Sequence, residues 1–78
     1  MEKYAPDTII VKFKDNISKK HIKELNKLYN TVLINDIPQL NVMILNIPKN
    51  KSVEEMINIY KDNDAVEYVE PDYYVDID

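Results

Sequence analysis

Two hydrophobic periods alternate along this chain of 78 residues, and their order restricts the fold more than any other feature. Apolar side chains recur at every second position where Ile9, Val11 and Phe13 share one face, which is the period of a half-buried strand. Elsewhere they recur at every third or fourth position, which is the period of an amphipathic helix. The strand-like segments are residues 7–14, 31–37, 41–47 and 65–69, and the helix-like segments are residues 18–29 and 52–61.

Both predicted helices begin at a serine whose hydroxyl can accept a hydrogen bond from a backbone N–H of the first turn. Ser18 precedes the first helix, and Ser52 precedes the second with Glu55 at the three-residue spacing of a capping box. The residues predicted to face the core are Ile22, Leu25, Leu28 and Tyr29 in the first helix and Val53, Met56, Ile57 and Tyr60 in the second.

Right-handed crossovers and the pairing of neighbouring segments lead from this order to an α+β, ferredoxin-like β-α-β-β-α-β fold. We expect a four-stranded antiparallel sheet with both helices on one face. Residues 31–37 and 41–47 nevertheless carry apolar side chains at consecutive positions, whereas a strand with one wet face alternates. We expect the uncovered face to contact another protein, although a central strand can also tolerate extra β-branched residues without a partner.

The chain contains neither glycine nor cysteine. Without glycine it cannot build the phosphate-binding loops that need a residue lacking Cβ, so we predict no nucleotide cofactor. Without cysteine it has no disulfide, and the redox compartment cannot be inferred. A domain of this size buries only roughly 60% of its unfolded surface, so its stability depends on packing or on a partner.

The residues that could carry out catalysis or bind metal are few. Ser18 and Ser52 are explained as helix caps, and His21 lies on a lysine-rich helix where an exposed side chain is expected. We therefore predict that the chain is not an enzyme. The acids that could bind calcium lack the spacing and the glycine of an EF-hand, so a turn and a solvated tail are favoured over a metal site. These acids are Asp62, Asp64, Asp72, Asp76 and Asp78.

Charge and hydropathy exclude two further partners. Residues 62–78 hold seven acidic residues and no lysine, which disfavours nucleic acid, and Phe13 and Tyr68 are the aromatic residues of the predicted strands. No apolar run approaches the roughly 20 residues of a membrane span, and residues 1–6 lack the apolar core of a signal peptide.

The closing sequence AVEYVEPDYYVDID, from Ala65 to Asp78, resembles the end of the propeptide of subtilisin-like serine proteases, the inhibitor family called I9. DTIIVKFK in residues 7–14 is similar to the opening strand of that family, and residues 52–72 are similar to its closing helix and strand. The chain then divides into a propeptide or inhibitor domain, residues 1–72, and an extended C-terminal tail, residues 73–78. We expect regular strand pairing to stop at Pro71, which has no N–H to donate.

The resemblance implies that the sheet packs on two parallel helices of a subtilisin-like catalytic domain while the tail occupies the substrate cleft. The tail residues are Tyr73, Tyr74, Val75, Asp76, Ile77 and Asp78. Val75 would enter the apolar pocket four residues before the cut, and Glu70 and Asp72 would cap the two protease helices. Asp78 would precede the scissile bond, where subtilisins prefer an apolar or aromatic residue, so the cognate enzyme has a basic pocket or the cut lies elsewhere, for example after Tyr74.

The function implied is that of a propeptide that inhibits its protease in the zymogen and acts as its intramolecular chaperone. A later cut in residues 38–40 or 48–51 would release it. One alternative is a free-standing I9 inhibitor, and another is a ferredoxin-like binding module unrelated to proteases. The compartment stays open, because secretion or attachment to the cell envelope follows only if the chain is part of a typical protease precursor.

Overall fold

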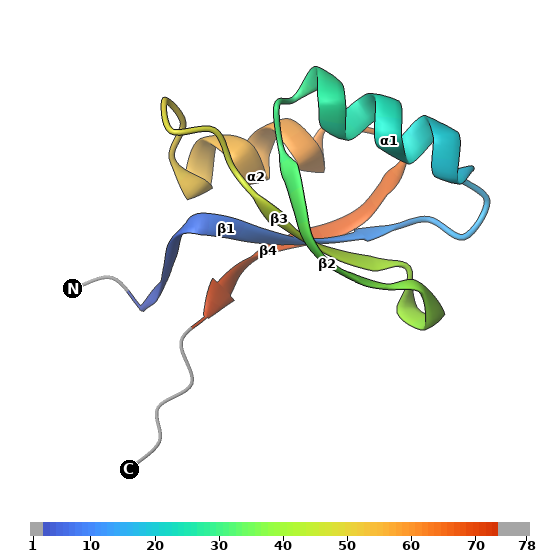
Figure 1. The fold of residues 1–78 in the computed structure, drawn as a ribbon, viewed down its shortest axis with the longest axis horizontal. Helices are drawn as coiled ribbons and strands as arrows, with labels where there is room; N and C mark the ends of the chain where they lie inside the picture. The colour runs from blue at the N-terminus through green and yellow to red at the C-terminus, as the bar shows by residue number, and fades with distance from the viewer. Residues whose placement is uncertain (1–2, 74–78) are drawn as a thin grey trace, which may run out of the picture.

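The computed structural model describes residues 3–73 and contains the elements in the predicted order (Figure 1). They are β1 (Tyr4–Phe13), α1 (Lys19–Leu28), β2 (Val32–Ile37), the 3-10 helix η1 (Pro38–Leu40), β3 (Val42–Asn46), α2 (Val53–Lys61) and β4 (Val66–Tyr73). The strands form one sheet in the order β2-β3-β1-β4, and each pair is antiparallel. Both helices lie on the same face of this sheet. The predicted ferredoxin-like arrangement is confirmed.

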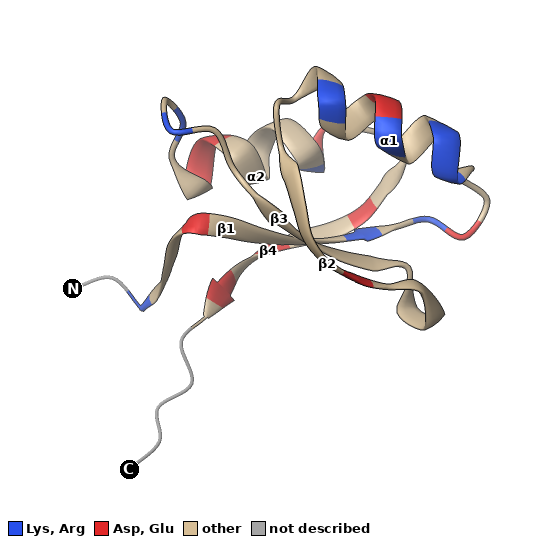
Figure 2. Cartoon of the chain, viewed as in Figure 1, with Lys and Arg blue, Asp and Glu red and all other residues tan. Residues whose placement is uncertain are grey.

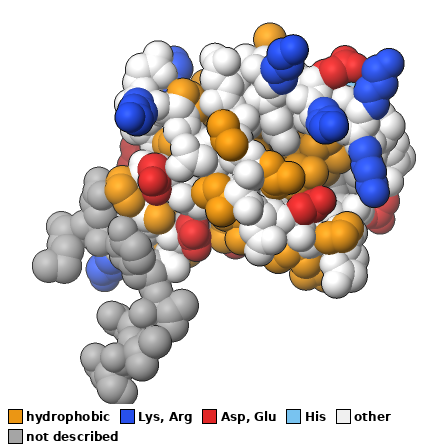
Figure 3. Space-filling model, viewed as in Figure 1, with side chains coloured by type: hydrophobic (Ala, Val, Ile, Leu, Met, Phe, Trp, Pro, Cys, Tyr) orange, Lys and Arg blue, Asp and Glu red, His pale blue; other side chains and the backbone are white. Residues whose placement is uncertain are grey.

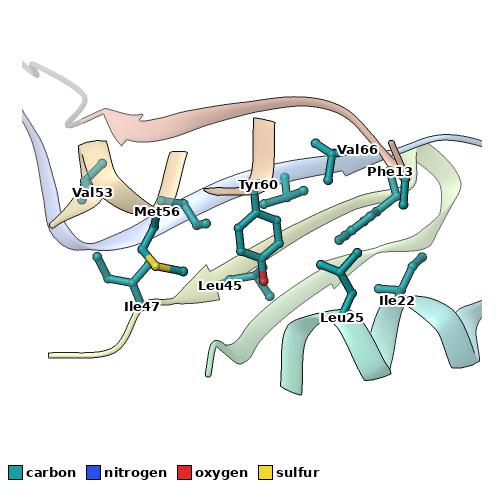
Figure 4. Packing of buried hydrophobic residues seen from close by; sticks show 12 residues of the cluster. Phe13, Ile22, Leu25, Leu45, Ile47, Val53, Met56, Tyr60 and Val66 are labelled. Atoms are coloured by element: carbon teal, nitrogen blue, oxygen red, sulfur yellow. The ribbon is translucent and has the colours of Figure 1, made fainter. Parts of the chain in front are cut away.

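The core lies between the helices and the two central strands, β1 and β3. Ile9, Val11 and Phe13 are buried, as their spacing predicted, and they pack with Leu45 of β3. Figure 4 shows the ring of Tyr60 in the middle of this cluster, where α2 faces the sheet. Because one residue in two along β1 points to the helices, the other half of the strand faces away from the core.

Both serine caps are present. Ser18 Oγ accepts a 3.1 Å hydrogen bond from the backbone N–H of His21. At α2 the capping box is complete, because Ser52 Oγ accepts from the Glu55 N–H and Glu55 Oε1 accepts from the Ser52 N–H, each at 3.1 Å. Hydrogen bonds from Ser52 hold the pKa of the Glu55 carboxyl below its usual value, and the bond from the Ser52 backbone has a larger effect than the one from its side chain.

Helix α1 ends in a Schellman motif. The Thr31 N–H donates to the carbonyl oxygen of Asn26 at 3.0 Å, and the Asn30 N–H donates to that of Lys27 at 3.1 Å. Asn30 adopts the left-handed conformation that this motif requires, with φ of 59°. Asn41, just before β3, also adopts the left-handed conformation, with φ of 56°. In this glycine-free chain asparagine thus occupies the positions where glycine is usual.

The structure corrects one prediction about the core. Leu28 was expected to face it, but its side chain is 73% exposed. Its neighbour Tyr29, also predicted to face the core, does so and packs edge-on against Tyr60, with the ring centroids 5.0 Å apart. The last turn of α1 therefore uses Tyr29, and not Leu28, to contact the core.

Regular pairing ends at Pro71 as expected, but β4 does not. β4 continues through Pro71, which lies opposite Ile9, and ends at Tyr73, which lies opposite Tyr4. β4 is an edge strand, and an edge strand can accommodate a proline because only one of its sides takes part in the sheet. Tyr73, assigned to the tail from the sequence, is thus the last residue of the sheet.

Candidate functional site

The sheet face opposite the helices, here called the uncovered face, is the candidate binding surface. The strand register places Ile10 and Lys12 of β1 on it, together with their neighbours on β3 and β4. The residues that the register assigns to the uncovered face are Thr8, Ile10, Lys12, Val32, Asn35, Ile37, Val42, Ile44, Asn46, Tyr68 and Glu70. Six of these eleven are apolar, and they come from all four strands, as the sequence predicted for a face that the helices do not cover.

Exposure on the uncovered face is greatest toward the two edges of the sheet. Val32 of β2 is 64% exposed and Tyr68 of β4 is 44% exposed, whereas Ile10 and Ile44 in the centre are half-buried by their neighbours. Val42 is buried although it lies outside the core cluster between helices and sheet. The uncovered face is therefore a partly apolar platform whose margins are exposed.

The side chain of Lys12 connects the uncovered face of β1 to η1. Its Nζ donates a 2.9 Å hydrogen bond to the carbonyl oxygen of Leu40 in η1. The aliphatic stem of Lys12 lies beside Val42, its partner in the register, which helps to explain why Val42 is buried. The sequence did not indicate this contact, because it joins residues 28 positions apart.

Two carboxylates predicted to contact a partner lie on one strand. Glu70 is on the uncovered face opposite Ile10, and the alternation of β4 assigns Asp72 to the same face. Figure 2 shows acidic residues along β4, whereas the lysines gather on α1. Alternate residues of a strand are about 7 Å apart, so the two carboxylates form a short acidic row next to the apolar platform.

Beyond this row β4 ends at Tyr73, whose ring packs edge-on against Tyr4. The predicted tail residues Tyr74, Val75, Asp76, Ile77 and Asp78 lie outside the described residues. The sequence had not singled out Tyr4, although an aromatic residue near each end of the chain, each two residues from a proline, was a possible signal.

A second feature lies on the helix side of the sheet. A hollow of about 270 Å³ separates α1 from the hairpin of β2 and β3, and Leu33 on its margin is 49% exposed. Figure 3 shows hydrophobic side chains gathered there, below the lysines of α1. Its lining residues are Phe13, Lys19, Ile22, Lys23, Leu33, Asp36, Pro38, Asn41 and Met43. β2 is consequently exposed on both of its faces.

The residues considered for catalysis are dispersed. Ser18 and Ser52 bond to their own helices, and His21 is exposed. Within residues 3–73 no three histidine, aspartate or glutamate side chains lie together as ligands for a metal ion. In the same part of the chain no helix has the length and apolar character needed to cross a membrane.

The comparison with protein families agrees with this geometry. No curated protein and no solved structure shows significant similarity to the chain. The sequence profile of the fervidolysin N-terminal prodomain, however, matches residues 1–72, which include both helices and all but the last residue of β4. The chain therefore belongs to the fervidolysin N-terminal prodomain family, a family of propeptides of subtilisin-like proteases.

Proposed function

We propose that this propeptide domain inhibits the catalytic domain of a subtilisin-like protease and assists its folding. The observation that carries the proposal is the uncovered face, an apolar surface on one side of the sheet that the helices of the domain do not cover. Membership of the prodomain family supplies the kind of partner. A contact of standard size would bury about 800 Å² on each partner, which suits one face of a small sheet.

The acidic row on β4 supports a specific way of docking. Glu70 and Asp72, about 7 Å apart along the strand, would accept hydrogen bonds at the N-termini of two adjacent protease helices. Helices packed side by side have axes about 8 to 10 Å apart, so one carboxylate can reach each helix. An anion at a helix N-terminus is favoured by about 0.3 to 1 kcal/mol.

Residues 74–78 of the predicted tail, which follow Tyr73 at the end of β4, would then occupy the substrate cleft as an added strand. Each backbone hydrogen bond formed there contributes about 0.5 to 1.5 kcal/mol net. Docking of the sheet raises the effective concentration of the tail at the cleft. The tail would thus behave as a cleaved product that the sheet prevents from leaving.

The same contact accounts for the proposed folding role. A partner that binds only the native arrangement of a protein stabilises that arrangement by mass action. The domain would favour the folded catalytic domain, and the catalytic domain would stabilise a propeptide that has no disulfide. A second cut in η1, residues 38–40, or in the loop of residues 48–51, which follows β3, would end the inhibition.

The test is a titration of the fervidolysin catalytic domain and of subtilisin with the purified chain, while cleavage of a chromogenic peptide is followed. The full chain should inhibit at least one of the two enzymes. A chain ending at Asp72 should bind at least about 100-fold more weakly, because it loses several backbone hydrogen bonds in the cleft. Refolding of the denatured catalytic domain, with and without the chain, measures the folding role.

A matched variant separates docking by the sheet from a non-specific effect. Replacing exposed Val32 by Asp puts a charge on the uncovered face without touching the tail or the core. It should weaken inhibition strongly, whereas replacing Leu28 by Asp, on the exposed side of α1, should not. Equal inhibition by the full chain and by the chain ending at Asp72 would contradict occupation of the cleft.

A further inference from the structure

The aromatic contact at the end of the sheet has unusual surroundings. The rings of Tyr4 and Tyr73 meet edge to face, with centroids 6.3 Å apart and planes at 86°. Tyr4 is half-buried and packs against the core cluster, whereas Tyr73 is 61% exposed. Tyr4 is therefore anchored to the body of the domain, and Tyr73 rests on it.

The pairing of these two residues is separated from the rest of the ladder. Pro71 lies opposite Ile9, and the next pair along the two strands is Tyr73 with Tyr4. Between these two pairs β4 moves by two residues, whereas β1 moves by five. Pro6 falls within the longer stretch and has no N–H to donate. The Asp7 carbonyl oxygen accepts a 2.9 Å hydrogen bond from the Ile47 N–H instead of pairing with β4.

Regular backbone pairing thus does not extend continuously to Tyr73. The edge-to-face geometry is one of the favourable arrangements of two aromatic rings, and it occurs at the point where the ladder resumes. The contact between the rings therefore adds to the isolated backbone pair of Tyr4 and Tyr73 in holding the end of β4 against β1. The last regular pair before this isolated one is Ile9 with Pro71.

We propose that Tyr4 is a positioning residue, whose ring fixes Tyr73, the residue from which the proposed inhibitory tail, residues 74–78, begins. This inference rests on the proposed function. A tail that starts from a fixed residue loses less conformational freedom on binding than one that starts from a loose segment. Release of Asp72 and Tyr73 would also lengthen the flexible connection and lower the effective concentration of the tail.

The experiment is a thermodynamic cycle between Tyr4→Ala and removal of the tail. Inhibition of the fervidolysin catalytic domain and of subtilisin is measured for the full chain and for a chain ending at Tyr73, each with and without the substitution. Tyr4→Ala should weaken inhibition by the full chain about 3- to 10-fold, which is the size expected for an aromatic pair. It should leave the shorter chain unchanged, because that chain has no residues 74–78 to position.

Two further variants separate positioning from stability. Tyr4→Phe keeps the ring and should inhibit like the parent chain. Tyr4→Leu keeps an apolar side chain against the core but cannot make the edge-to-face contact, so it should inhibit like Tyr4→Ala. The NMR signals of the Tyr73 ring in the free chain should show a ring-current shift that is present with Tyr or Phe at position 4 and absent with Leu.

The possible results distinguish the inference from the function on which it rests. A full chain that inhibits neither enzyme overturns the proposed function. A full chain whose inhibition is unchanged by Tyr4→Leu, or one that loses potency equally with and without residues 74–78, overturns the positioning role and leaves the proposed function intact.

Discussion

The phenol of Tyr60 donates a 2.7 Å hydrogen bond to Oδ1 of Asn26, which ties the buried face of α2 to α1. The hydroxyl of Thr31 lies 2.6 Å from the same phenol oxygen. The single proton of the Thr31 hydroxyl has two acceptors within reach, the Tyr60 phenol oxygen and, at 3.2 Å, the carbonyl oxygen of Asn26. This polar group joins the two helices and the start of β2 inside an otherwise apolar core, where each unmade hydrogen bond is costly.

Replacing Tyr60 by Phe should lower the free energy of unfolding by about 1 to 3 kcal/mol, because the polar atoms of Asn26 and Thr31 lose a buried partner. Urea unfolding followed by circular dichroism measures this loss. Tyr68→Phe is the matched control, since Tyr68 is on the uncovered face, and its effect should stay within about 0.5 kcal/mol. Equal effects at the two positions would show that the hydrogen bonds of Tyr60 do not stabilise the fold.

Stability should also fall in alkali. Burial raises the pKa of Tyr60 to about 12, although the hydrogen bond from Thr31 acts in the opposite direction. A raised pKa means that the folded state favours the neutral phenol, so this contribution is complete below pH 10, the ordinary pKa, and is lost as the pH rises through about 12. The difference in unfolding free energy between the parent chain and Tyr60→Phe should therefore shrink between pH 10 and 12. A difference that stays constant over this range would argue against the raised pKa.

The left-handed residue that ends α1 offers a stabilising substitution. Asn30→Gly should raise the free energy of unfolding by about 0.5 kcal/mol, because glycine adopts this conformation without the steric cost of a Cβ. The same change at Asn58, inside α2, should lower it by a few tenths of a kcal/mol. Thermal unfolding of both variants measures the contrast, and destabilisation by Asn30→Gly would contradict the role assigned to φ.

The acidic row should contribute to binding in a salt-dependent way. The double variant Glu70→Gln, Asp72→Asn should inhibit its protease about 3- to 30-fold more weakly if each carboxylate caps a helix. The difference should diminish as ionic strength rises, because salt screens exposed charges. Glu67→Gln, at an exposed acid of the same strand, serves as the control and should have little effect. A loss that does not depend on salt would mean that the carboxylates act in another way.

Local signals in the sequence were sufficient for most of the fold. The capping box of Ser52 and Glu55 depends on residues three positions apart, and the buried face of β1 depends on simple alternation. The prediction for Leu28 failed although that for Tyr29 was confirmed, because both residues have helical spacing from Leu25. Only Tyr29 contacts Tyr60, a residue distant in the sequence.

The candidate site was predicted in outline only. The apolar uncovered face follows from strands that lack polar alternation, and it was expected. The continuation of β4 to Tyr73 was not, because the rule that proline ends pairing considers one strand and not its position at the edge of the sheet. The partnership of Tyr4 with Tyr73 joins opposite ends of the chain, so it depends on the completed fold.

The position of β2 at the edge of the sheet has a consequence for the behaviour of the isolated domain in solution. It is an edge strand with consecutive exposed apolar side chains, Val32, Leu33 and Ile34, and neither lysine nor proline interrupts it. Such an edge offers backbone donors and acceptors to any extended polypeptide, including the unfolded form of the same chain. Concentrated stocks of the isolated domain should therefore be prone to aggregation through the β2 edge.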